Sequence, residues 1–131
     1  MIVSGWSAGG HLTAMCLDEP GIIGGVAISG IYDLTPVRLS YLNNKLQLSD
    51  DEVQSLSPLS LPLSLRPLVL MYGTDELPEL QRQSEQFGAV RSGLPGNLVP
   101  LAQRNHFTIL NELAAPDGAI TREVCALAGI K

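Results

Sequence analysis

Apolar residues gather in four short runs along the chain, and polar or helix-like segments separate them. The runs are MIVSG at residues 1–5, IIGGVAIS at 22–29, LVLMYG at 68–73 and NLVPLA at 97–102. The first three lack an alternation of apolar and polar positions, which is typical of strands covered on both faces of a parallel sheet. Pro100 has no amide hydrogen, so the fourth strand is predicted at or near a sheet edge.

The segments between these runs predict helices and two irregular stretches. Helices are predicted over residues 8–17, over 37–56 as two short helices, over 78–92, and as one or two helices over 105–129. Ser49 and Glu52 have the spacing of a capping box, and Pro78 suits a first helical turn. Residues 30–37 and the proline-rich residues 57–67 are predicted as loops.

The alternation of strands and helices predicts an α/β fold with a mostly parallel sheet of about four strands. We expect a single domain over residues 1–131.

Charge and composition narrow the classes of partner. The formal net charge is −5, with 13 acidic and 8 basic residues and no run of Lys or Arg, so no nucleic-acid or membrane partner is expected. The longest apolar stretch, residues 21–32, is too short and glycine-rich to span a bilayer. No basic residue precedes the apolar start, so a cytoplasmic location is expected. Cys16 and Cys125 lie far apart and outside a CxxC pattern, which favours two reduced thiols and no metal site.

Candidate chemistry begins at Gly5-Trp6-Ser7-Ala8-Gly9, which fits G-x-S-x-G between a predicted strand and a predicted helix. In such a turn the Ser7 hydroxyl is lifted clear of the sheet. The Ala8 amide then points at the position where an oxyanion would form. We expect side chains at Gly5 and Gly9 to collide with the neighbouring chain. A glycine-rich turn with an incidental serine also fits the motif, so the motif alone leaves both interpretations open.

A nucleophilic serine needs a base, and the chain offers two histidines. His11 lies on the helix that leaves the turn, and its side chain is expected to pack beside that helix rather than over Ser7. His106 directly follows the fourth strand, at the carboxyl end of the sheet, where parallel α/β folds build their sites. An isolated histidine there would be read as a helix cap or a surface residue. The upstream serine motif makes His106 the preferred base.

The acid that orients the base is expected at the end of the third strand. Asp75 and Glu76 both lie on the loop that follows this strand, and either carboxylate could bind the far nitrogen of His106. Glu79 falls inside the next predicted helix and is expected either to be solvated or to interact with the dipole at the N-terminus of that helix. Residue patterns alone leave Asp75 and Glu76 open.

The chain also resembles a known family. The segments GWSAGGHL, ISGIYDL, LSPL, GTDELPELQRQS and RNHFTILNEL resemble the C-terminal half of an α/β-hydrolase of the arylformamidase (kynurenine formamidase) group, near the small carboxylesterases. The resemblance covers nearly the whole chain and implies a partial α/β-hydrolase fold that lacks the N-terminal strands. By this resemblance Ser7 matches the nucleophile, His106 the base and Glu76 the acid, with Asp75 as the alternative. Trp6 stands where the family often has histidine.

The reaction that the resemblance implies is hydrolysis of a small formamide or ester with no metal or cofactor. For an arylformamidase the substrate would be N-formylkynurenine, and for a general carboxylesterase a short-acyl ester. The resemblance also implies that Ile31 and Tyr32 lie near the substrate.

Family members carry about as much chain again before the serine turn, including a His-Gly-Gly loop that completes the oxyanion hole. With Ala8 as the single donor, a rate loss of about a hundred- to a thousand-fold is expected. Residues 2–4 would present an unpaired strand edge, which favours self-association or pairing with a separate N-terminal half. The alternative function is therefore a non-catalytic fragment or subunit of a hydrolase.

Overall fold

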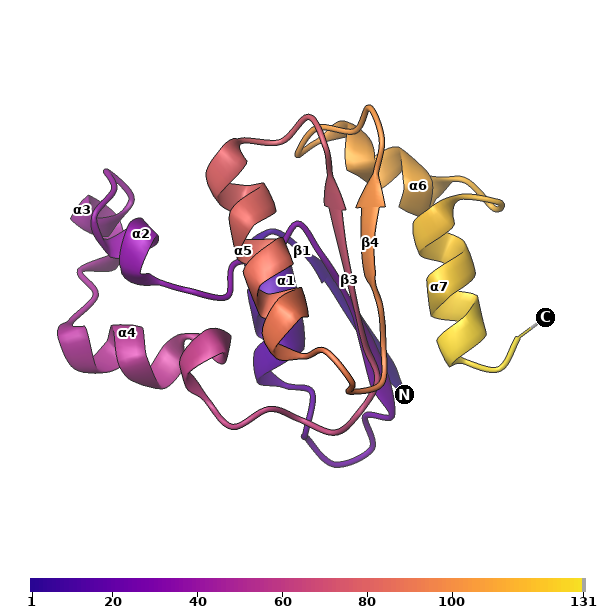
Figure 1. Cartoon of the computed structure of the whole chain (residues 1–131), viewed down its shortest axis with the longest axis horizontal. Helices are drawn as coiled ribbons and strands as arrows, with labels where there is room; N and C mark the ends of the chain where they lie inside the picture. The colour runs from indigo at the N-terminus through magenta and orange to yellow at the C-terminus, as the bar shows by residue number, and fades with distance from the viewer. Residues whose placement is uncertain (131) are drawn as a thin grey trace.

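A four-stranded sheet forms the centre of the protein (Figure 1). A computed structural model describes residues 1–130. The strands are β1 (Ile2–Trp6), β2 (Gly24–Ile28), β3 (Leu68–Gly73) and β4 (Leu98–Leu101), and they lie in the order β1-β2-β3-β4. Every neighbouring pair is parallel. The predicted α/β class and the predicted strand number are confirmed.

The two central strands are buried along their whole length, because alternate residues face opposite layers. Ala27 and Leu70 face a cluster beneath one helical layer. Val26 and Met71 face a second cluster on the opposite side. This double burial explains why β2 and β3 read as continuous apolar runs.

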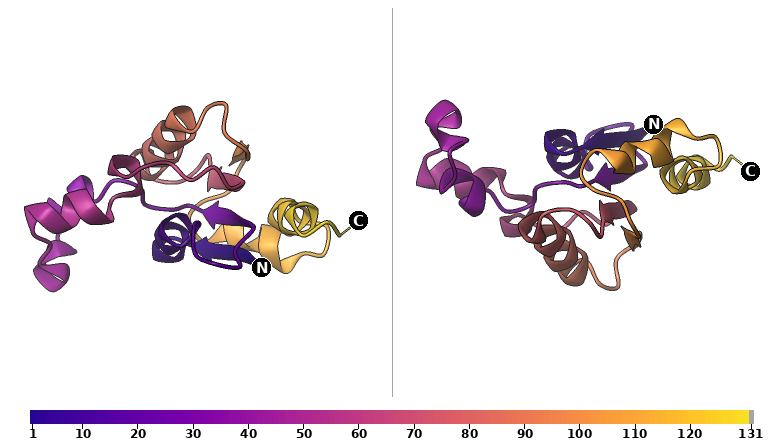
Figure 2. Two further views of the ribbon diagram at one scale, coloured as in Figure 1. Left: turned by 90° about the horizontal axis from the view of Figure 1, so that it is seen from below. Right: turned by 90° about the horizontal axis from the view of Figure 1, so that it is seen from above.

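Helices cover both faces of the sheet (Figures 1 and 2). One face carries α1 (Ala8–Met15) and α5 (Pro78–Val90). The other face carries the short α6 (Asn111–Ala114) and α7 (Ala119–Leu127), with a 3₁₀ turn at Thr108–Leu110 before them. Among residues 1–130, every helix is too short or too polar to cross a bilayer.

The two outer strands have different characters. β4 contains Pro100 and pairs only with β3 in the described chain, which confirms its predicted edge position. β1 pairs only with β2 within residues 1–130, so its other side is a second open edge, as expected for residues 2–4. The serine turn therefore lies at the end of an edge strand.

The segment that connects β2 to β3 in the sequence forms three short helices. Together they make an arm that projects away from the sheet (Figure 1). They are α2 (Thr35–Arg38), α3 (Asn43–Leu46) and α4 (Asp50–Leu56). Two helices were predicted here, and the loop predicted over residues 30–37 was wrong at α2. Pro36 occupies the first turn of α2, where its missing N–H leaves no acceptor unsatisfied. Pro58 starts a 3₁₀ turn (Pro58–Ser60) in the same way within the predicted proline-rich loop.

The predicted capping box of α4 is present. The Ser49 hydroxyl accepts from the Glu52 N–H at 3.2 Å, and the Glu52 carboxylate accepts from the Ser49 N–H at 2.8 Å.

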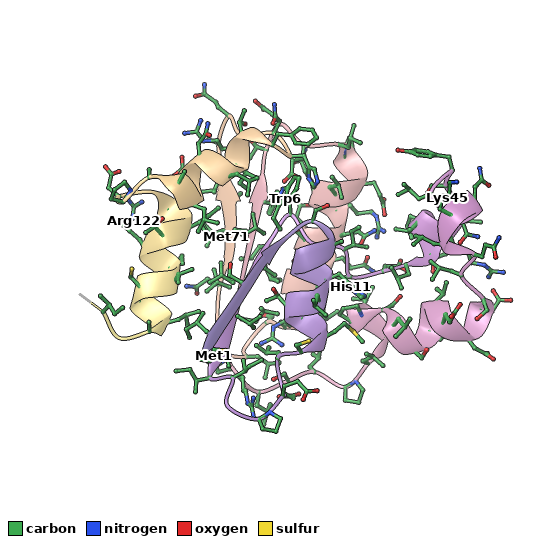
Figure 3. The ribbon with its side chains drawn as sticks, turned by 180° about the vertical axis from the view of Figure 1, so that it is seen from behind. Met1, Trp6, His11, Lys45, Met71 and Arg122 are labelled. Atoms are coloured by element: carbon green, nitrogen blue, oxygen red, sulfur yellow. The ribbon has the colours of Figure 1, made fainter. Side chains whose placement is uncertain are left out.

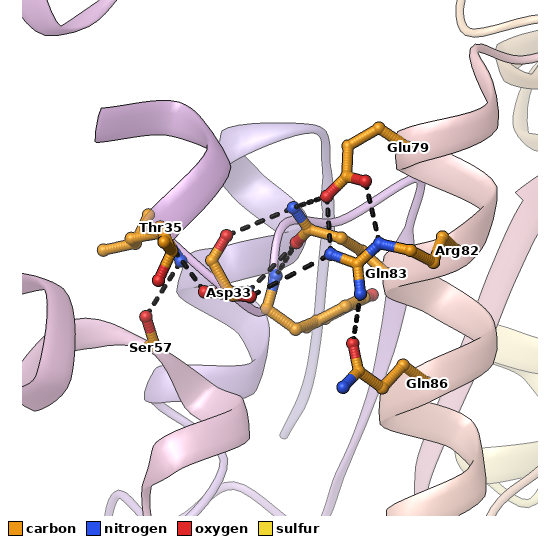
Figure 4. Close-up of polar contacts among 9 residues, drawn as sticks. Asp33, Thr35, Ser57, Glu79, Arg82, Gln83 and Gln86 are labelled. Carbon is orange, nitrogen blue, oxygen red and sulfur yellow. Dashed lines mark hydrogen bonds and ion pairs between the residues drawn. The ribbon is translucent and has the colours of Figure 1, made fainter. Parts of the chain in front are cut away.

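The arm is fixed to the body where it begins, and its two ends are joined to each other (Figure 4). Gln83 of α5 is only 3% exposed, and its Oε1 accepts from the N–H groups of Tyr32 and Asp33 at 2.8 and 3.0 Å. Its Nε2 donates to the Asp33 carbonyl at 3.1 Å. The Ser57 hydroxyl, after α4, accepts from the Leu34 N–H, before α2, at 2.9 Å, so this bond joins the two ends of the arm to each other. These bonds satisfy backbone groups that would otherwise be buried without partners.

Candidate active site

Ser7 occupies the tight turn between β1 and α1, as the strand–turn–helix pattern predicted. Its φ and ψ are 58° and −117°, a backbone conformation that residues other than glycine seldom adopt. The Ser7 N–H donates to the Ile28 carbonyl at 2.9 Å, and the Ser7 carbonyl accepts from the N–H groups of Gly10 and His11. The turn thus holds the serine at the carboxyl end of the sheet while α1 begins behind it.

Steric crowding was predicted at two glycines of this turn, and the structure shows it at one of them. A Cβ at Gly5 would lie 2.2 Å from the Gly9 carbonyl oxygen, so glycine is required there, as expected. The expected collision at Gly9 was wrong, because in the described chain a Cβ at that position meets no atom within 4 Å apart from the backbone of its own helix. The second crowded position is Gly10, whose Cβ would lie 2.7 Å from Gly30 Cα. Gly10 is therefore the residue of α1 that lies against the backbone following β2.

His106 lies between Ser7 and a carboxylate. Its Nε2 is 3.0 Å from Ser7 Oγ, and its Nδ1 is 2.7 Å from Glu76 Oε1. An ionised carboxylate only accepts hydrogen bonds, so Nδ1 carries the hydrogen, and in the neutral ring Nε2 accepts from the Ser7 hydroxyl. The fold therefore brings together a hydroxyl, an imidazole and a carboxylate from the ends of β1, β4 and β3.

The structure separates the two candidate acids. The Glu76 side chain is completely buried against His106. Asp75, the alternative, is exposed, and no hydrogen bond joins its carboxylate to His106 in the described chain. Glu79 pairs with Arg82 on the surface of α5, and this guanidinium lowers the pKa of Glu79. Of the two, Glu76 is the carboxylate that contacts His106.

His11 is directed away from Ser7. Figure 3 shows it on α1, on the side of that helix that faces the arm. Its Nε2 lies 2.7 Å from the Leu56 carbonyl oxygen at the end of α4. The expectation that His11 packs beside the helix is confirmed.

Ser29, which the sequence reasoning missed, also contacts Glu76. Glu76 Oε2 accepts from the Ser29 hydroxyl at 2.8 Å and from the Gly73 N–H at 2.6 Å. Ser29 directly follows β2, so the available signal was a hydroxyl residue at the carboxyl end of a buried strand next to β3.

Trp6 braces the loop that carries His106. Its indole N–H donates to the His106 carbonyl at 2.7 Å, and the centres of the two rings are 4.9 Å apart. Phe107 lies 5.9 Å from the Trp6 ring and is 70% exposed. Figure 3 places Trp6 at the carboxyl end of β1. An aromatic surface therefore adjoins the imidazole.

Tyr32 belongs to the core rather than to the substrate side. It is fully buried and stacks on Phe87 with ring centres 4.6 Å apart, which corrects the position implied by the resemblance. Burial raises the pKa of the Tyr32 hydroxyl, which has no hydrogen-bond partner in the described chain. Ile31 is half-buried.

The Ala8 amide is a candidate donor to an oxyanion. Ala8 is the first residue of α1, so its N–H has no acceptor within the helix. The helix dipole adds partial positive charge at the same place. The side chain of His106 is 22% exposed, and Ser7 is half-buried. A separate cavity of about 300 Å³ lies at the opposite end of the sheet, between the end of α1 and the proline-rich segment.

No family model matches the chain, but two curated proteins are similar to it over nearly its whole length. The chain is 30% identical to the kynurenine formamidase of Salmo salar and 26% identical to that of Danio rerio. Each alignment covers 98% of this chain and 50% of the other protein. The chain thus spans about half the length of the curated relatives it matches.

Solved structures share the fold. A protein from Silicibacter sp. TM1040 that is assigned as a thioesterase superposes with a TM-score of 0.81 at 24% identity. This match covers 91% of this chain and 48% of that protein. An esterase/lipase from an uncultured bacterium superposes with a TM-score of 0.71 at 23% identity, covering 98% of this chain and 52% of the other. These likenesses show the α/β-hydrolase fold in part.

Proposed function

We propose that this chain, a partial α/β-hydrolase related to the kynurenine formamidases, carries a serine-hydrolase site that cleaves a formamide or a carboxylic ester. The hydrogen-bond chain from Ser7 through His106 to the buried Glu76, at 3.0 and 2.7 Å, carries the proposal. The names of the curated relatives favour the formamide, with N-formylkynurenine as the substrate.

In the first half of the reaction Ser7 Oγ attacks the formyl carbonyl while His106 Nε2 takes the hydroxyl proton. The carbonyl oxygen becomes an oxyanion, to which the Ala8 N–H donates. Glu76 keeps Nδ1 protonated and stabilises the imidazolium. The C–N bond then breaks as His106 returns the proton to the leaving aromatic amine, and a formyl ester remains on Ser7.

In the second half water replaces the amine. His106 takes a proton from this water, whose oxygen attacks the formyl ester and forms a second oxyanion. The ester bond breaks, His106 returns the proton to Ser7 Oγ, and formic acid leaves and loses its proton to water to become formate. An ester substrate follows the same steps with an alcohol as the first leaving group.

The decisive experiment compares Ser7→Ala with Ser4→Ala. Ser4 lies exposed on the same strand and serves as the matched control. We expect hydrolysis of N-formylkynurenine, followed by the absorbance of the released amine, in the wild type and in Ser4→Ala but not in Ser7→Ala. A fluorophosphonate should label the same two proteins at Ser7, as read by mass spectrometry.

Each other result has a defined meaning. Activity that persists in Ser7→Ala removes Ser7 from the mechanism. A wild-type chain that is neither labelled nor active favours the alternative of a non-catalytic fragment. A kcat/KM greater for an activated acetate ester than for the formamide favours a general carboxylesterase over an arylformamidase.

A further inference from the structure

We infer that Ser29 is a positioning residue, whose buried hydroxyl fixes the carboxylate of Glu76 in the orientation that holds His106. This inference rests on the proposed function, in which Glu76 orients the base. Ser29 follows β2 and is fully buried, and its hydroxyl donates to Glu76 Oε2 at 2.8 Å. The two residues lie 47 positions apart in the sequence, on neighbouring strand ends.

The two oxygens of the Glu76 carboxylate have separate partners. Oε1 accepts from His106 at 2.7 Å, and Oε2 accepts from Ser29 and from the Gly73 N–H. A glutamate has one more rotatable bond than an aspartate, so its carboxylate needs more contacts to hold one orientation. The Gly73 N–H belongs to the end of β3, three residues before Glu76, whereas the Ser29 hydroxyl comes from the chain that leaves β2. Together the donors fix the plane of the carboxylate relative to the sheet.

The backbone of Ser29 strengthens the inference. Its φ is 48°, in the left-handed region that glycine adopts without strain and serine adopts at a cost. The Ser29 N–H donates to the Met71 carbonyl at 2.7 Å, which holds the residue against β3. Glycine would make the same backbone bond with less strain. What serine adds is the hydroxyl, and that hydroxyl donates to Glu76.

The test removes the hydroxyl without imposing backbone strain. Ser29→Gly suits the observed φ, and Ser29→Ala removes the same bond in a second background. Gln47→Gly is the matched control, because Gln47 is exposed on the arm and also has a positive φ of 51°. We expect Ser29→Gly to lower kcat on the order of ten- to a hundred-fold with KM unchanged, by analogy with the loss of a hydrogen-bond partner that orients a metal-bound histidine. Gln47→Gly should leave both constants unchanged.

A second readout needs no turnover. In proton NMR, the Nδ1 hydrogen of His106 should give a far-downfield resonance, assigned by its loss in His106→Gln. We expect this resonance to move or broaden in Ser29→Gly and Ser29→Ala and to stay unchanged in Gln47→Gly. A folded Ser29→Gly protein with an unchanged resonance overturns the inference, whatever its rate. If the wild-type chain neither turns over nor reacts with a fluorophosphonate, the proposed function fails, and the resonance still decides the role of Ser29.

Discussion

A methyl group added at Gly5 tests the packing of the serine turn. In Gly5→Ala the new Cβ would lie 2.2 Å from the Gly9 carbonyl oxygen and 2.4 Å from its carbon. These are backbone atoms of α1, so no side-chain rotation relieves the overlap, and strand and helix must separate. The helix has little freedom to shift, because Gly10 already meets the chain at Gly30. We expect a loss of about 3 kcal/mol in the free energy of unfolding, the upper end of the range for overpacking.

Gly9→Ala is the matched change on the same turn. A Cβ at Gly9 meets nothing within 4 Å in the described chain apart from the backbone of its own helix, and alanine favours a helix over glycine. This variant should gain up to about 1 kcal/mol. At this chain length one kcal/mol corresponds to about 4 °C in Tm. Thermal melts followed by far-ultraviolet circular dichroism should therefore show a fall of about 12 °C for Gly5→Ala and a rise of up to about 4 °C for Gly9→Ala. Equal stability of the two variants would refute the steric reasoning.

Four further substitutions test the site and its surroundings. Glu76→Gln should lower kcat by about ten-thousand-fold, and Asp75→Asn should stay within about twofold of the wild type; steady-state kinetics in which only the Asp75 change is harmful would contradict the choice of acid. Trp6→Phe removes the indole N–H that braces the loop of the base, and should lower stability by about 1 kcal/mol in urea titrations and also slow turnover; an unchanged kcat would mean that the brace does not position the base. The hydrogen bond from the Ala119 N–H lowers the pKa of Glu112 most, and the hydrogen bond from the Arg104 guanidinium lowers it further. Its stabilising effect is present above the usual glutamate pKa and is lost as pH falls through the lowered value, so Glu112→Gln should destabilise the protein near neutral pH and not in strong acid. A stability difference independent of pH would contradict this assignment.

The strands of the sheet could be predicted because each buried strand is a continuous apolar run in the sequence. β2 and β3 are apolar at every buried position, and the structure has them where the runs predicted. The open side of β1 was expected from the resemblance and not from its residues. The helix α2 was missed because residues 30–37 are rich in turn-forming types, and a proline that opens a helix resembles one that breaks it.

The site was predictable to the extent that each residue has a local signature. Ser7 has its turn, and His106 and Glu76 each follow a strand. The contact of Ser29 with Glu76 joins residues 47 positions apart, and no pattern within either segment encodes such a pairing. The error at Gly9 has a related cause. The rotation of α1 about its axis decides which of its glycines faces the backbone that follows β2. The serine motif does not determine this rotation.

Gln83 holds the start of the β2–β3 connection, at Tyr32 and Asp33, against α5 (Figure 4). The rest of the connection, the arm, lies outside the sheet. We expect exchanges within α2 and α3, neither of which has a buried residue, to leave the ends of β2 and β3 in place. We therefore expect α2 and α3 to be exchangeable as a cassette, whereas α4 must keep its contacts, because its Val53 is buried and its Leu56 carbonyl oxygen lies 2.7 Å from His11 Nε2.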